Sequence, residues 1–99
     1  MGNRCLELER DLRISPTNVD FSSLTELAEC WGYSFKRQKG SHCIYKQEEV
    51  GGMPKEYAMM NFQERAGQAK SYQVRQLMKA IDWIQKEASD FTDRVHGNN

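Results

Sequence analysis

A single histidine lies within a basic segment of the chain, residues 35–46, which reads FKRQKGSHCIYK. An imidazole has an unperturbed pKa of about 6.5, so His42 can accept or donate a proton near neutral pH. Clustered cations attract anions even when the total charge of a protein is zero. The segment is therefore a candidate anion-binding surface that contains one acid or base. All charged side chains between residues 33 and 47 are basic, namely Lys36, Arg37, Lys39 and Lys46.

Simpler structural roles for these residues stay open. A strand histidine can satisfy a backbone carbonyl, and lysines on an edge strand prevent sheets of different molecules from pairing. The sequence also leaves open which face of the sheet His42 occupies. Ile44 lies on the same side by alternation, which would draw both residues toward the helices. His42 is thus either a functional group or part of a structural hairpin.

The composition is that of a small folded domain. The chain has 99 residues, of which 38% are hydrophobic and 28% are charged, with 14 basic and 14 acidic side chains. The charged N-terminal segment lacks the apolar region of a secretion signal, so we expect a soluble, cytoplasmic protein. Cys5, Cys30 and Cys43 show no paired spacing. We therefore expect reduced thiols, no metal site and no other cofactor.

Two helical segments are expected before the basic hairpin. Residues 1–20 contain a short helix-compatible run that Pro16 ends, and we expect this segment to form an N-terminal arm. A stronger helix opens in the stretch DFSSLTELAECWGY, where Ser23 forms a capping box with Glu26. Gly32 closes this helix as a C-terminal cap. The apolar residues on one face of the helix are Leu24, Leu27, Ala28 and Trp31.

Three strands and a long helix are expected to follow. The hairpin strands begin at Tyr33 and Ser41, with the turn at Lys39 and Gly40. Residues 56–62, EYAMMNF, form a third strand, and residues 63–70 form a polar loop. Ser71 begins the long helix, and periodicity is lost after residue 88. The apolar stripe of the helix consists of Val74, Leu77, Met78, Ile81 and Ile84.

The order of these elements predicts an α+β fold. Residues 21–88 are expected to form a two-layer α-β-β-β-α domain, between the arm at residues 1–20 and a disordered tail at residues 89–99. In this domain two helices cover one face of a three-stranded antiparallel sheet, and the other face stays open. Double-stranded-RNA-binding domains have the same arrangement, but a shared arrangement does not by itself assign a function.

Two segments of the chain resemble the HicA family (YcfA-like proteins), small mRNA interferases of type II toxin–antitoxin systems. The first is the hairpin RQKGSHCIY, with a Gly-Ser-His motif at residues 40–42. The second, NFQERAGQAKSYQVRQLMKAI, combines the third strand, a glycine-containing turn and the start of the long helix. With the preceding helix, the resemblance covers about residues 22–85. The chain differs from many members at Cys43, where they have a second histidine, and alternation turns Cys43 away from His42.

The resemblance implies a toxin that cleaves mRNA without a metal ion and is inhibited by a HicB-type antitoxin. In this reaction the ribose 2′-hydroxyl attacks the adjacent phosphate, and His42 would move the proton as general acid or base. One such group contributes about a hundredfold to ten-thousandfold to the rate, so we expect a slow endoribonuclease. The groups expected to bind RNA are Arg37, Lys39, Gly40, Ser41, Lys46 and Lys70.

A binding module without catalysis is the alternative on the same fold. The open sheet face and the basic hairpin could hold structured RNA. Alternatively, the chain binds only a protein, with Trp83 as one contact because it lies off the apolar stripe of the long helix. Binding of RNA separates the purely protein-binding module from the other two functions.

Overall fold

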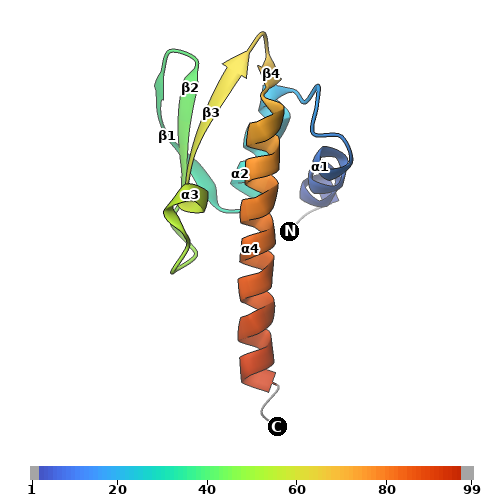
Figure 1. The fold of residues 1–99 in the computed structure, drawn as a ribbon, viewed down its shortest axis with the longest axis vertical. Helices are drawn as coiled ribbons and strands as arrows, with labels where there is room; N and C mark the ends of the chain where they lie inside the picture. Colours follow the sequence, from blue (N-terminus) through green and yellow to red (C-terminus); the bar gives the residue numbers. More distant parts are fainter. Residues whose placement is uncertain (1–2, 97–99) are drawn as a thin grey trace.

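The computed structural model describes the backbone of residues 3–96 and the side chains of residues 3–89. The chain has an α+β fold with two N-terminal helices, a four-stranded antiparallel sheet and a long C-terminal helix (Figure 1). The strands are neighbours in the order β1-β2-β3-β4. The elements are α1 (Asn3–Ile14), α2 (Phe21–Cys30), β1 (Tyr33–Lys39), β2 (His42–Gln47), α3 (Lys55–Ala58), β3 (Met59–Arg65), β4 (Gln68–Ala69) and α4 (Ser71–His96).

The hydrophobic core lies between one face of the sheet and the helices α2 and α4. Figure 1 shows β1, β2 and β3 on one side of α4, with α2 behind that helix. The predicted apolar faces of both helices are confirmed, although Trp31 and Ile84 are only half-buried. The buried hydrophobic residues of these elements are Leu24, Leu27, Ala28, Tyr33, Cys43, Tyr45, Met60, Phe62, Ala69, Val74, Leu77, Met78, Ala80 and Ile81.

Helix α2 begins earlier than the capping box predicts. Its N-cap is Asp20, and the backbone N–H groups of Ser23 and Leu24 donate to the Asp20 carbonyl. Asp20 forms a β-bridge with Gln68, so pairing with β4 fixes the chain just before the helix. The predicted capping box at Ser23 is therefore wrong. Gly32 does close the helix, with φ at +87°, and a Cβ there would collide with the side chain of Gln47.

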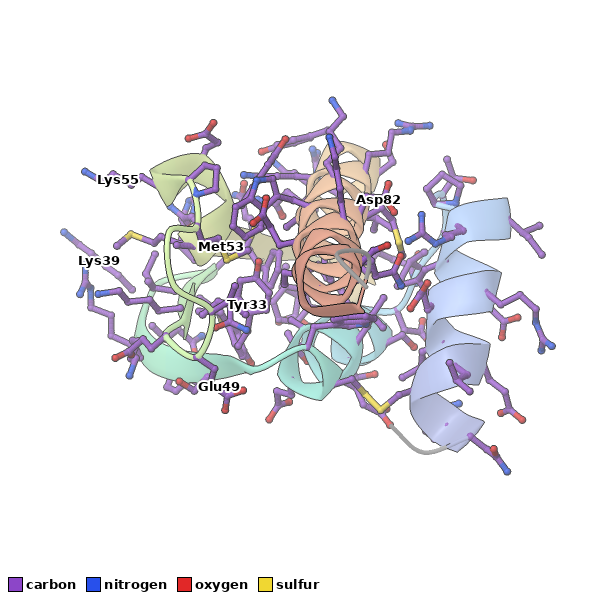
Figure 2. The ribbon with its side chains drawn as sticks, turned by 90° about the horizontal axis from the view of Figure 1, so that it is seen from below. Tyr33, Lys39, Glu49, Met53, Lys55 and Asp82 are labelled. Carbon is purple, nitrogen blue, oxygen red and sulfur yellow. A yellow bond between two sulfur atoms is a disulfide. The ribbon has the colours of Figure 1, made fainter. Side chains whose placement is uncertain are left out.

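The N-terminal segment is a packed helix rather than a loose arm. Leu8 and Leu12, one turn apart on α1, are buried in the same core as α2 and α4. A disulfide joins Cys5 of α1 to Cys30 of α2, and Figure 2 shows this sulfur–sulfur bond between the two helices. The expectation of three reduced thiols is therefore wrong for this pair. The cysteines lie 25 positions apart, a separation that carries no pairing signal. Cys43 is free and buried.

The third strand begins later than predicted, and a fourth strand follows it. Residues 55–58 form the short helix α3, and β3 runs from Met59 to Arg65. Ala66 and Gly67 both have positive φ angles, of 52° and 77°, as a tight hairpin turn requires. The predicted polar loop at residues 63–70 thus contains this turn and β4, so the sheet has four strands instead of three.

The last helix continues to His96, whereas the sequence predicted disorder from residue 89. Its apolar residues Ile84, Ala88, Phe91 and Val95 keep a spacing of three and four positions, which favours a helix through this region. The end of the predicted tail, residues 97–99, lies outside the described residues. None of the helices in the described part of the chain combines the length and the apolarity that a membrane crossing needs.

Candidate functional site

Strand β2 presents His42 on the open face of the sheet. Burial alternates along this strand: Cys43 and Tyr45 are buried, whereas His42 and Lys46 are exposed and Ile44 is half-buried. Because neighbouring strand residues point to opposite faces, His42, Ile44 and Lys46 share the face away from the helices. The sequence had left this face undecided. The opposite orientation of Cys43 confirms the alternation predicted for that residue.

A β-bulge in β1 brings two cations to the same face. Phe35 pairs with Tyr45, but the next paired residue is Arg37, which lies opposite Ile44, so Lys36 is the extra residue. An extra residue reverses the alternation of everything that follows it. Arg37 therefore takes the open face. Without the bulge its side chain would have pointed toward the helices.

The effect of the bulge extends to the end of β1. Lys39 lies directly opposite His42 in the register, and paired residues of antiparallel strands point to the same face. Figure 2 shows Lys39 at the side of the molecule away from α4. Nothing in the local sequence marks the bulge, so the sequence could not place these cations relative to His42.

The hairpin turn holds the loop residues of the predicted motif next to these side chains. Gly40 and Ser41 connect Lys39 to His42, and Gly40 has a φ of 60°, as the first central residue of a type II′ turn requires. The side-chain amide of Gln38 donates to the Gly40 carbonyl at 2.9 Å. The hydroxyl oxygen of Ser41 accepts a hydrogen bond from the Gln63 amide at 3.4 Å. The motif residues thus form an ordered turn at one end of the site.

Strand β3 contributes a residue that the sequence analysis did not single out. The Oδ1 atom of Asn61 lies 3.0 Å from Nδ1 of His42. Asn61 is exposed, between the buried residues Met60 and Phe62. This alternation was a usable signal, since a polar residue between two core residues of a strand must lie on the open face.

A surface cavity of about 480 Å³ collects these groups in one place. Two cations from β1 lie beside one imidazole and one amide, and the side chain of Ile44 supplies an apolar surface. Such a combination suits an anion that carries a ring or another apolar part. The lining residues are Arg37, Lys39, Gly40, His42, Ile44 and Asn61.

Two of the predicted RNA-binding residues do not line this cavity. Lys46 lies on the same face as His42, four positions along β2, which corresponds to about 13 Å. Lys70 follows β4, the strand at the edge of the sheet farthest from β1. Both cations are therefore farther from His42 than the cavity residues Arg37 and Lys39.

Lys36, the extra residue of the bulge, forms an ion pair with Glu48. The hydrogen bond and the charge of Lys36 lower the pKa of the Glu48 carboxyl, and the charge of Lys46 adds to this effect. Glu48 is therefore a carboxylate at neutral pH, and it offsets part of the positive charge at this end of the hairpin.

No protein-family model, no curated protein and no solved structure matches this chain. Among the described residues, no group of three or more His, Cys, Asp or Glu side chains could hold a metal ion. The site offers one imidazole, two adjacent cations and one amide, all open to solvent on one face of the sheet.

Proposed function

We propose that the chain is a HicA-like endoribonuclease toxin that cleaves mRNA without a metal ion. The observation that carries this proposal is the position of His42 on the open face, in one cavity with Arg37 and Lys39. An imidazole that acts on RNA must be accessible, and it needs cations close by to hold the phosphate. The proposal further includes a cytoplasmic location and inhibition by a HicB-type antitoxin.

The proposed reaction is an attack of the ribose 2′-oxygen on the adjacent phosphorus. His42 accepts the 2′-hydroxyl proton, the new O–P bond forms, and the bond from phosphorus to the 5′-oxygen breaks. The leaving 5′-oxygen takes up a proton from water and His42 returns its proton to the solvent, so the products end in a cyclic phosphate and a 5′-hydroxyl. Arg37 and Lys39 stabilise the negative charge that grows on the phosphate oxygens.

We also infer that residues 21–88 form the HicA-like domain on a layout similar to that of double-stranded-RNA-binding domains. This inference is supported by the order of α2, β1, β2, β3 and α4 and by the common core of both helices. In this view α1, α3 and β4 are additions to the layout. Lys46 and Lys70 then extend the RNA-binding surface beyond the cavity.

A noncatalytic RNA-binding module on the same surface is the second candidate. One observation favours it: among the residues that line the cavity, His42 is the only one with an imidazole or a carboxyl group. Fast RNA cleavage usually uses one group as base and another as acid. A lone histidine with two cations is also compatible with binding alone.

The test compares wild-type protein with His42→Ala in bacterial cells and in vitro. Growth and mRNA integrity are followed after induction, and the purified proteins are incubated with RNA. We expect growth arrest and fragments with cyclic phosphate ends for the wild type, and at least about a hundredfold slower cleavage for the variant. Lys79→Ala is the control, because Lys79 is an exposed residue of α4 outside the cavity.

Each other outcome selects a different conclusion. Cleavage by His42→Ala at the wild-type rate refutes the role of His42. RNA binding without cleavage by the wild type supports the noncatalytic module. A wild-type protein that neither cleaves nor binds RNA refutes both proposals and leaves a protein-binding domain.

A further inference from the structure

The contact between Asn61 and His42 bears on which ring nitrogen carries a proton. Oδ1 of an asparagine side chain carries no proton and can only accept a hydrogen bond. The distance of 3.0 Å to Nδ1 of His42 is that of a hydrogen bond, so Nδ1 must be the donor. In a neutral imidazole with a proton on Nδ1, the other nitrogen, Nε2, has a free lone pair.

The sheet brings these two side chains together from different strands. Asn61 lies directly opposite Ile44, and His42 is two positions from Ile44 on the same face of β2. His42 and Asn61 are therefore diagonal neighbours, whose Cα atoms are typically about 7–8 Å apart. A planar imidazole and a short amide span this distance with one hydrogen bond. A longer polar residue at position 61 would have to fold back to make the same contact.

Asn61 is itself held in place from the other side of the sheet. The amide of Gln73, on α4, donates from Nε2 to the Asn61 carbonyl at 2.5 Å and accepts at Oε1 from the Gln63 N–H at 2.8 Å. Gln73 is only 4% exposed. The main chain that carries Asn61 is thus fixed by a buried side chain of the long helix, which limits how far Asn61 can move away from His42.

We propose that Asn61 is a positioning residue that holds His42 in the tautomer whose Nε2 accepts a proton in the cavity. This inference rests on the proposed nuclease, in which the proton comes from the ribose 2′-hydroxyl. Arg37 and Lys39, the charged neighbours from β1, would hold the phosphate next to that hydroxyl. Asn61 does not touch the reacting atoms in this scheme, and it acts through the ring of His42.

The first readout is the tautomer of His42, measured without RNA. Nitrogen NMR of the imidazole distinguishes a protonated from a bare ring nitrogen, and His96→Gln leaves His42 as the only histidine of the full chain. At a pH where the ring is neutral, we expect the proton on Nδ1. In Asn61→Ala the proton should move toward Nε2, and in Asn61→Asp, which keeps an acceptor oxygen, it should stay on Nδ1.

The second readout is the rate of RNA cleavage by the same proteins. Loss of one hydrogen bond that selects the tautomer should slow Asn61→Ala by about fivefold to tenfold. Asn61→Asp should recover only part of this loss, because its added negative charge lies in the same cavity as Arg37 and Lys39 and repels the phosphate. Met59→Ala is the matched control, because Met59 is an exposed residue two positions from Asn61 on the same strand and does not line the cavity.

The two readouts separate the failure of this inference from the failure of the nuclease. A wild-type protein with the proton on Nε2, or Asn61→Ala with an unchanged tautomer and an unchanged cleavage rate, overturns the role of Asn61. If the wild-type protein has the proton on Nδ1 but cleaves no RNA, the proposed nuclease function is overturned. The proposed catalytic role of the contact between Asn61 and His42 is then overturned as well. An equal loss in Met59→Ala and Asn61→Ala would show a general disturbance of β3 and also overturn the inference.

Discussion

Replacement of Gln73 by leucine should destabilise the fold strongly, because one buried side chain satisfies two main-chain groups. Strand β4 pairs only with Glu64 and Arg65, so it leaves the Asn61 carbonyl and the Gln63 N–H without a strand partner. The amide of Gln73 bonds both groups. This side chain thus takes the place of a longer edge strand.

The magnitude follows from the groups that the substitution leaves unpaired. Each buried backbone donor or acceptor without a partner costs about 1–3 kcal/mol, and a buried leucine returns about 1–2 kcal/mol of transfer free energy. The two groups together cost about 2–6 kcal/mol, and the gain from leucine leaves a net loss of about 0–5 kcal/mol, so we expect Gln73→Leu to lower the free energy of unfolding by about 2–3 kcal/mol, the middle of this range. For a domain of this size, 1 kcal/mol corresponds to about 4–8 °C in Tm, so the melting temperature should fall by about 10 °C or more.

Urea unfolding followed by circular dichroism and tryptophan fluorescence measures this change. Gln76→Leu is the control: Gln76 lies on the same helix and donates to the Glu56 carbonyl at 3.2 Å, but this bond is exposed to solvent. The control should change the free energy of unfolding by less than about 1 kcal/mol. If Gln73→Leu is as stable as the control, the argument about the edge of β3 is wrong.

Three further predictions concern the disulfide, a buried phenol and the cations of the cavity. The disulfide between Cys5 and Cys30 closes a loop with a sequence separation of 25, so its reduction should lower the free energy of unfolding by about 3 kcal/mol. Dithiothreitol should not change the stability of the variant in which both cysteines are replaced by serine. Burial raises the pKa of Tyr33, whose hydroxyl donates to the Tyr57 carbonyl at 2.6 Å. The contribution of Tyr33 to stability is therefore complete below the unfolded pKa of about 10. It is lost as the pH rises above this value, by about 1.4 kcal/mol per pH unit. In Tyr33→Phe, the free energy of unfolding should fall with a smaller slope during alkaline titration. Lys39→Ala should reduce the slope of log K against log salt for single-stranded RNA by about 0.7, whereas Lys79→Ala should leave it unchanged. A slope that stays at the wild-type value in Lys39→Ala would remove this lysine from the RNA contacts.

The cavity depends on the β-bulge in β1. Side-chain alternation alone would have placed two of its cations on the wrong face of the sheet. Strict alternation from Tyr33 puts Arg37 and Lys39 on the buried face, together with Phe35. The extra residue at the bulge corrects this, because a single inserted position exchanges the two faces for the rest of the strand. Arg37 and Lys39 line one cavity with His42, but their common face depends on a bulge that the sequence does not reveal.

The sequence by itself determined the features that depend on neighbouring residues. The apolar stripes of α2 and α4, the glycine at the end of α2, the turn at Gly40 and the opposite orientations of His42 and Cys43 all follow from local periodicity and backbone preference. Each of these signals lies within a few positions of the chain, where the spacing of residue types and the conformation are directly coupled.

Only the tertiary structure decided which distant residues meet. The disulfide between α1 and α2 joins Cys5 to Cys30, and the short strand β4 pairs with the end of β3. Asn61 of β3 contacts His42 of the neighbouring strand β2. These contacts depend on strand register and helix packing, and a change of one position in register would separate the partners. The local sequence therefore determines the types of groups at the site. Their distances and orientations depend on the folded sheet and on the helices that pack against it.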